Sequence, residues 1–407
     1  MNIHPMQPRE VPLMQKGQAP VLLAYGFRPF FLLTGAYALV LILGWLGFLF
    51  AGWSLPLGWS PFQWHSHEML YGLVSAAIAG FLLTAVTNWT GAPPLKGGRL
   101  LALVLLWMGG RISMWLASWI PTWLVALVDL AFLPVLALYL LRVLVAYKNR
   151  RNLLLVVVLS LLFGGNLLMH LGFVSGRTDL LAAGERLGLD LILLLMAVIG
   201  GRIIPAFSAN WLRMHGGDAN WVTRSVWTDR VALMSVALLI ALDGLGVSET
   251  SLGLIALVAA LSNGLRLWQW AGWRVCKEPM LWILHLGYAW VVLSLSLRAL
   301  AALIGAVPDS AWQHALGAGA IGTLLLGVMT RVAVGHTGRP LKLAPFGLGI
   351  YLAITAAAVL RLLVALQVLD FRLGLSLAGL AWTLAFGLFT VLYWPILSRP
   401  RADGRPG

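Results

Sequence analysis

The stretch "FQWHSHEMLYGLVSAAIAGFLLTAVTNWTG" occupies residues 62–91 and joins a polar head to a long apolar run. The run at 66–88 has the length, about 20 residues, that an α-helix needs to cross the hydrocarbon core of a bilayer. Its polar head holds His65, His67 and Glu68, where ionisable groups are costly and are usually kept for a function. The stretch therefore predicts a transmembrane helix with a candidate site at one end.

The same apolar pattern recurs along nearly the whole chain of 407 residues. The chain is 60% hydrophobic and only 10% charged, and its mean hydropathy is +0.89, which places it outside the range of water-soluble domains. It predicts an all-α, polytopic membrane protein with about twelve transmembrane helices. We expect these helices near 29–52, 66–88, 99–118, 122–146, 153–175, 187–208, 228–247, 251–272, 280–304, 312–335, 344–367 and 371–396.

Basic residues predict how the chain is oriented in the membrane. Every second connection is basic, as with Lys96 and Arg99 after the second helix or Lys148 and Arg150 after the fourth. Under the positive-inside rule this alternation puts both termini in the cytoplasm. We therefore expect a cytoplasmic tail at 1–24, one membrane domain at 25–398 and a second cytoplasmic tail at 399–407.

The net charge of +14 is explained by this topology and does not indicate nucleic-acid binding. Residues 1–20 lack an apolar stretch that ends in a small-residue cleavage site, so we expect no signal peptide. The lipid bilayer is the expected surrounding, and a bacterial cytoplasmic (inner) membrane the expected location. The single cysteine, Cys276, excludes an intramolecular disulfide, haem attachment through C-x-x-C-H and clusters held by four cysteines. Any metal must then bind nitrogen or oxygen ligands.

The topology sorts the ionisable residues of the helices into two layers. The layer towards the periplasm holds His65, His67, Glu68, Arg111, His170 and His314, together with Arg298 and Arg361. The layer towards the cytoplasm holds Arg28, Arg202, His285, Arg331 and His336. Imidazole binds iron, copper and zinc, and arginine pairs with carboxylates such as haem propionates. The alternative for each histidine is a packing residue that bonds to a neighbouring helix.

The spacing of His65 and His67 sets a geometric limit. Residues two apart on a helix point about 200° away from each other, so one helical HxH does not easily hold a single metal. The pair can serve two cofactors on opposite sides of the helix, or it can lie before the helix proper. Glu68, three residues after His65, is expected beside it on the same face, as proton carrier, metal ligand or orienting partner. An acid that only complements the helix dipole is the alternative.

A weak internal repeat links the second and tenth predicted helices. A shift of 247 residues lays His67 on His314, Gly72 on Gly319 and Gly91 on Gly338. The separation is eight helices instead of six, so the repeat does not indicate a simple duplication of two halves.

Five stretches together resemble the NnrS family: "YGFRPFFLL" at 25–33, "WHSHEMLYG" at 64–72, "AGFLLTAVTNWTG" at 79–91, "GGRIIPAF" at 200–207 and "GVMTRVAVGHTGRPL" at 327–341. The resemblance implies a twelve-helix inner-membrane protein with haem and copper, linked to nitric oxide metabolism, denitrification and protection from nitrosative stress. It leaves open whether the activity is reduction of nitric oxide, its sequestration or repair of iron-nitrosyl damage, and it assigns no ligands.

Together these observations predict an oxidoreductase similar to a nitric oxide reductase, which uses haem b, with copper as a second candidate cofactor, and receives electrons from membrane quinol. The expected metal ligands are His65, His67, His170 and His314, with Glu68 as the catalytic proton carrier or orienting base and Arg111 as the propionate partner. His285 and His336, near Arg202 and Arg331, are expected to hold a second haem or a quinol. The alternatives are a haem-based nitric oxide sink or sensor, and a twelve-helix proton-coupled transporter.

Overall fold

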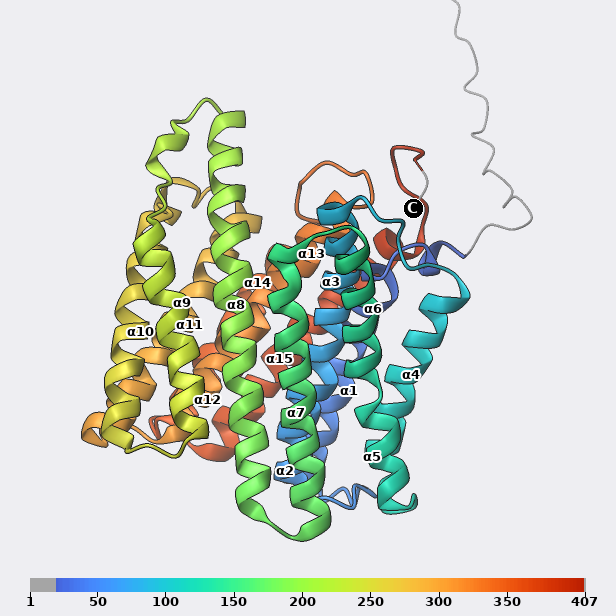
Figure 1. The fold of residues 1–407 in the computed structure, drawn as a ribbon, viewed down its shortest axis with the longest axis vertical. Helices are drawn as coiled ribbons and strands as arrows, with labels where there is room; N and C mark the ends of the chain where they lie inside the picture. The colour runs from blue at the N-terminus through green and yellow to red at the C-terminus, as the bar shows by residue number, and fades with distance from the viewer. Residues whose placement is uncertain (1–19, 406–407) are drawn as a thin grey trace, which may run out of the picture.

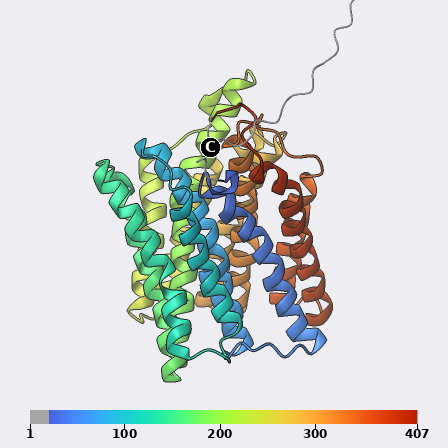
Figure 2. The ribbon, with the colours of Figure 1, turned by 90° about the vertical axis from the view of Figure 1, so that its right-hand side faces the viewer.

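The computed structural model describes residues 20–405, and all regular structure in that part of the chain is helical. The helices run side by side in one bundle, and the two ends of the described chain meet at the same end of it (Figure 1, Figure 2). Arg28 joins these ends, because its Nη1 donates to the carbonyl oxygens of Leu397 at 2.7 Å and Arg399 at 2.9 Å. We call this the terminal end of the bundle, and the opposite one the α2 end.

Ten helical segments of the described chain are long and apolar enough to cross a membrane. This confirms an all-helical, multi-pass membrane protein. They are built from α1 (Phe27–Ala51), α2 (Pro61–His67) with η2 (Glu68–Val74) and α3 (Ser75–Thr90), α5 (Thr122–Leu130) with α6 (Phe132–Ala146), α7 (Leu153–Ser175), α8 (Thr178–Met214), α10 (Glu249–Gln269), α11 (Pro279–Ile304), α12 (Asp309–His314) with η6 (Ala315–Ile321) and α13 (Gly322–Gly335), α14 (Leu348–Ala365), and α15 (Phe371–Ser398).

The other two predicted spans, 99–118 and 228–247, are also helical but are not among the ten. They correspond to α4 (Gly98–Trp115) and α9 (Val226–Gly244). Each carries charged residues, such as Arg111 in α4 and Asp229 in α9, and charged residues lower the apolar character of a segment. The structure thus confirms helices at all twelve predicted places and membrane-spanning character at ten.

Two of the predicted spans differ from the helices that the structure shows. The span predicted at 187–208 belongs to α8, which has 37 residues and, at 1.5 Å per residue, is about 55 Å long. Its first turns carry polar residues, so hydropathy alone cannot show that the helix begins there. The span predicted at 122–146 is broken at Ala131, because Pro134 has no N–H to donate to the carbonyl of Leu130.

The predicted tail at 1–24 includes η1 (Val21–Leu23), a short 3₁₀-helix, and its residues 1–19 lie outside the described part of the chain. The second predicted tail, at 399–407, is described as far as residue 405.

Glycines let α7, α8 and the segment η2 approach closely. A Cβ on Gly184 would lie 2.5 Å from the carbonyl oxygen of Gly165, and a Cβ on Gly188 would lie 2.5 Å from the Tyr71 hydroxyl. Tyr71 donates to the Gly184 carbonyl at 2.6 Å. Small residues at such contacts are how membrane helices pack without a hydrophobic driving force. This contact brings α7 and α8 beside η2, where the candidate site begins.

Candidate functional site

Both helices that carry the repeated histidine contain a π-helix immediately after it. His67 ends α2 and is followed by η2, while His314 ends α12 and is followed by η6. The two π-helices have seven residues each and are separated by the same 247 positions as the sequence repeat. Gly91 and Gly338, which follow the helices, both have positive φ, +73° and +69°. π-helices are rare and often occur at functional sites.

His67 belongs to a buried cluster of six polar side chains. We call it the histidine–carboxylate cluster, and its members are His67, Glu68, Arg111, Asp129, Asn166 and His170. They come from α2, η2, α4, α5 and α7, so five elements meet here. The ligand atoms of His67, Asp129 and His170 lie within 4.8 Å of one another, as in a site that can hold a metal ion.

Asp129 is at the centre of this cluster. Its Oδ2 lies 3.2 Å from the Nε2 of His67 and 3.0 Å from the Nε2 of His170, and it accepts a hydrogen bond from the Asn166 amide at 2.8 Å. Its Oδ1 accepts from the Arg111 guanidinium. A carboxylate with two imidazoles is a donor set for iron, copper or zinc.

A neutral His67 cannot satisfy its two neighbours. Its Nδ1 lies 2.9 Å from Glu68 Oε1, and its Nε2 lies 2.8 Å from Asn166 Oδ1, which is an acceptor because the Asn166 amide nitrogen donates to Asp129. A neutral imidazole has only one N–H, so one of its nitrogens would face an acceptor with a lone pair. A second proton or a metal ion removes this conflict.

The charges lead to the same conclusion. Glu68 and Asp129 carry two negative charges, and Arg111 supplies one positive charge, which leaves one uncompensated negative charge in a buried cluster. Burying an unpaired charge is costly. The cluster therefore combines ligand atoms for a cation with a net negative charge, when its histidines are neutral, that a cation would neutralise.

The second site is a cavity of about 370 Å³ on the other side of α2, within the size range of ligand pockets. We call it the histidine cavity. His65, Glu185, His314 and Arg361 line it, together with aromatic and aliphatic side chains of α1, α8 and α15. The His65 ring stacks on Trp45, with centroids 4.4 Å apart and planes 17° apart.

One histidine in this cavity has a fixed hydrogen position. The Nδ1 of His314 lies 2.7 Å from the carbonyl oxygen of Ser310, so it carries the proton. The Nε2 then accepts from Arg361 at 2.7 Å. The Nδ1 of His65 is buried and has no hydrogen-bond partner among the described residues. His65 thus offers a nitrogen that a ligand could use, whereas the Nε2 of His314 would be available only if Arg361 moved away.

The family model described as NnrS protein matches residues 21–401. The chain belongs to the NnrS family. No curated protein matches it. Family membership confirms the resemblance found in the sequence, and it links this multi-pass membrane protein to nitric oxide metabolism.

In this NnrS chain the four histidines of the predicted outer layer form two pairs. His67 and His170 belong to the histidine–carboxylate cluster, and His65 and His314 line the histidine cavity. His65 and His67 therefore face different sites, in agreement with the angle of about 200° between residues two apart on a helix.

One other expectation about this layer is wrong. Glu68 does not lie with His65, because its carboxylate binds Tyr37, His67 and Arg111. The chain enters a π-helix at residue 68, which changes the angles between successive residues, and the ion pair with Arg111 holds the carboxylate. Arg111 is bound to two carboxylates, and the guanidinium that faces the histidine cavity is that of Arg361. The propionate role expected of Arg111 stays a prediction.

The two histidines of the predicted cytoplasmic layer contact different elements. The Nε2 of His285, in α11, lies 2.9 Å from the Ser208 hydroxyl of α8. The His336 ring, after α13, lies 5.8 Å from the Phe27 ring of α1. These contacts give no support to a cofactor shared by His285 and His336.

The arginines of that layer have structural partners. Arg202 donates to Asn152 at 2.8 Å, and Arg331 stacks on the Phe207 ring at 4.3 Å from its centroid. The role predicted for them beside a second cofactor stays a prediction.

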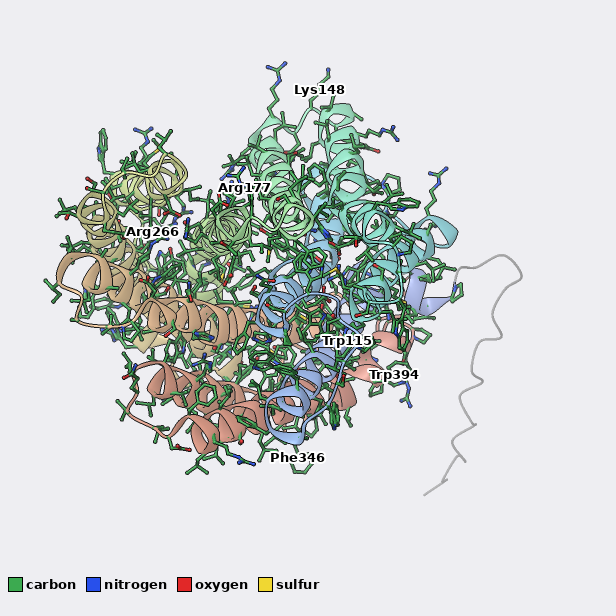
Figure 3. All side chains as sticks on the ribbon, turned by 90° about the horizontal axis from the view of Figure 1, so that it is seen from below. Trp115, Lys148, Arg177, Arg266, Phe346 and Trp394 are labelled. Atoms are coloured by element: carbon green, nitrogen blue, oxygen red, sulfur yellow. The ribbon has the colours of Figure 1, made fainter. Side chains whose placement is uncertain are left out.

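Another buried polar network lies among α8, α9, α10 and α11. Figure 3 shows one of its residues, Arg266, in a different part of the bundle from Trp115. The Arg266 guanidinium donates to Asp229 at 2.8 Å and to the Tyr288 hydroxyl at 2.7 Å, and that hydroxyl donates to Asn263 at 2.6 Å. Its charges and hydroxyl groups are paired with one another, so it stabilises helix packing and is no candidate site.

The sequence analysis missed Asp129, Asn166 and Glu185. A signal existed for Asp129, since a carboxylate seven residues into the apolar run at 122–146 is an intramembrane charge that needs a partner. Glu185 was missed because it precedes the predicted span at 187–208. No sequence signal distinguishes Asn166 from a packing residue.

Proposed function

We propose that this NnrS protein is a haem- and metal-containing redox protein of the bacterial inner membrane that acts on nitric oxide at the periplasmic side. The observation that carries the proposal is the pair of sites flanking α2, each with two histidines: a buried cluster in which two carboxylates share one arginine, and a ligand-sized cavity. In this proposal the chain crosses the membrane twelve times, with both termini in the cytoplasm.

The residues of the histidine cavity fit a haem b. His65 and His314 offer imidazole nitrogens, Arg361 offers a guanidinium for a propionate, and the stacked Trp45 and other aromatic side chains match a flat apolar ring. When bound, a haem supplies electron transfer. Arg361 would leave His314 for the propionate, and the Ser310 carbonyl would keep the His314 ring oriented.

The histidine–carboxylate cluster fits a metal ion, with His67, His170 and Asp129 as ligands. Copper is our first choice because imidazole nitrogens suit it and the family is described with it, and iron is the alternative. Glu68 would accept a hydrogen bond from the Nδ1–H of His67 and so orient the Nε2 of His67 towards the metal, as acidic partners of metal-bound histidines do. This favours the orienting role of Glu68 over proton transfer, since three groups already hold its carboxylate.

Reduction of nitric oxide follows 2 NO + 2 e⁻ + 2 H⁺ → N₂O + H₂O, so the site needs electrons and protons. Membrane quinol is the proposed electron donor, because the described part of the chain consists almost entirely of the helices of the membrane bundle. Glu185 is the proposed proton donor, because its carboxyl group lines the histidine cavity. That role was first predicted for Glu68.

An absorption spectrum and a metal count on the purified protein test this proposal. We expect a haem Soret band and a transition metal, and repeated conversion of nitric oxide to nitrous oxide when quinol is supplied. Absence of both cofactors would exclude the redox function and favour the proton-coupled transporter. Uptake that stops at one equivalent of nitric oxide would favour a sink or sensor.

A further inference from the structure

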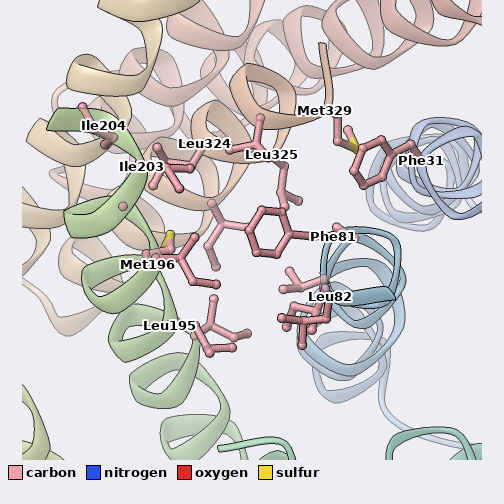
Figure 4. A pocket seen from close by; sticks show the side chains of 18 residues that line it. Phe31, Phe81, Leu82, Leu195, Met196, Ile203, Ile204, Leu324, Leu325 and Met329 are labelled. Carbon is pink, nitrogen blue, oxygen red and sulfur yellow. The ribbon is translucent and has the colours of Figure 1, made fainter. Parts of the chain in front are cut away.

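An apolar cavity of about 100 Å³ lies in the middle of the bundle, between α3, α8 and α13 (Figure 4). Every residue that lines it is aliphatic, aromatic, methionine or glycine. Figure 4 shows the Phe81 ring between Met196 of α8 and Leu325 of α13. A cavity with no polar partner disfavours water and binds small apolar molecules such as xenon.

This cavity adjoins the histidine cavity. Val74 and Ile321 line both of them, so these two side chains form a shared wall. Val74 is the last residue of η2 and Ile321 the last residue of η6, and they are equivalent under the shift of 247 residues. The two π-helices therefore end where the two cavities meet.

The cavity also connects to the outside of the helices. Ile78, Phe81, Met196 and Ile199 line it and are partly exposed, and they belong to helices of membrane-spanning length and composition. An apolar molecule dissolved in the bilayer can reach such an opening without entering water.

We propose that this apolar cavity is an entry chamber, which takes a small apolar gas molecule from the bilayer and passes it to the histidine cavity between Val74 and Ile321. The inference rests on the proposed function in that the gas is nitric oxide, an uncharged diatomic molecule. The polar contacts of the histidine–carboxylate cluster offer no comparable apolar route.

Xenon tests the chamber without any reaction. We expect xenon, applied under pressure to the purified full-length protein, to bind between Phe81, Met196 and Leu325 in a crystal or electron-microscopy map. The variant Ala77→Phe should lose this xenon, because Ala77 lines the cavity and a phenyl ring would fill it. Wild-type protein without xenon at this place would overturn the inference, whatever the protein does with nitric oxide.

The kinetic test uses two filling variants and one matched control. Ala77→Phe and Ile203→Trp should slow nitric oxide binding several-fold and leave cofactor content unchanged. Ala206→Phe adds the same ring as Ala77→Phe, but at an exposed position of α8, and this variant should bind nitric oxide at the wild-type rate. Wild-type rates in both filling variants would overturn the route. Failure of the wild-type protein to bind nitric oxide would instead refute the proposed function, and the xenon result would still decide whether the chamber takes gas.

Discussion

At the scale of single residues, Asp129 is the acidic ligand of the proposed metal site. Asp129→Asn keeps the shape of the side chain and removes its charge, so we expect the protein to lose most of the metal at this site and to keep any haem. Asp179→Asn is the control, because Asp179 is exposed and pairs only with the neighbouring Arg177 in the described contacts. Full metal occupancy in Asp129→Asn, measured by elemental analysis, would remove Asp129 from the ligands.

Glu68 tests the difference between orienting a ligand and transferring a proton. Glu68→Gln weakens the hydrogen bond that orients His67 through its Nδ1. Loss of such a partner typically lowers metal affinity about 10- to 100-fold. We expect this loss in a metal titration of the purified protein. If affinity stays the same while turnover falls, Glu68 is a proton carrier, as first predicted from the sequence.

Arg111 holds the cluster together in the absence of a metal. Arg111→Leu leaves Glu68 and Asp129 buried without their cation, and breaking a buried ion pair from one side costs about 3–5 kcal/mol. We expect a clear drop in unfolding temperature in detergent. Arg99→Leu, at an exposed position of the same helix, should unfold like the wild type.

How far the sequence predicts the site depends on the distance between partners along the chain. It predicted His67 and His170 as ligands and the different directions of His65 and His67, because these follow from residue chemistry and helix geometry. It could not pair His67 with His170 instead of His314, since that choice depends on which helices pack together. The carboxylate between them, Asp129, was not predicted, because its contacts with both histidines depend on how α5 packs beside α2 and α7.

At the scale of elements, the structure contains two similar units. In both, a histidine precedes a π-helix, and the next helix carries an arginine four residues before its end, Arg111 in α4 and Arg361 in α14. Arg111 donates to Glu68, the residue after His67, and Arg361 donates to His314 itself. The sequence repeat predicted the pairing of these helices. The π-helices were not predictable, because hydropathy is alike in α and π turns.

Gly72 in η2 leaves room for the Arg111–Glu68 ion pair. A Cβ there would lie 2.4 Å from Arg111 Nη1 and 3.0 Å from Glu68 Oε2. Gly72→Ala should therefore destabilise the protein, by about 1–3 kcal/mol as for other overpacked cores, and lower metal binding. Gly164→Ala is the control, because a Cβ at this position within α7 meets no atom within 4 Å and replaces a poor helix former. Equal stability of the two variants would contradict the close packing at Gly72.

At the scale of the whole molecule, hydropathy predicted where helices lie along the chain, because a segment in lipid must satisfy its own backbone hydrogen bonds. Ten of the twelve predicted spans have membrane-spanning length and composition. Hydropathy predicted the length of α8 poorly, because a helix can continue past the membrane without an apolar signal. Hydropathy also does not distinguish α4 and α9 clearly as membrane-spanning, because both carry charged residues. Charges such as that of Arg111 in α4 have buried partners, here Asp129, on neighbouring helices.

The orientation of the bundle decides which compartment the two sites face, and the single cysteine provides the test. Cys276 is exposed in the connection between α10 and α11, which the basic residues Arg274 and Lys277 assign to the cytoplasm. A membrane-impermeant maleimide should label it in inside-out vesicles but not in intact spheroplasts. Ser248→Cys in a Cys276→Ser background should show the reverse, because Ser248 lies exposed between α9 and α10 at the other end of the bundle. Labelling of Cys276 in intact spheroplasts would mean that the bundle has the opposite orientation in the membrane. The histidine cavity would then face the cytoplasm and take its protons from there.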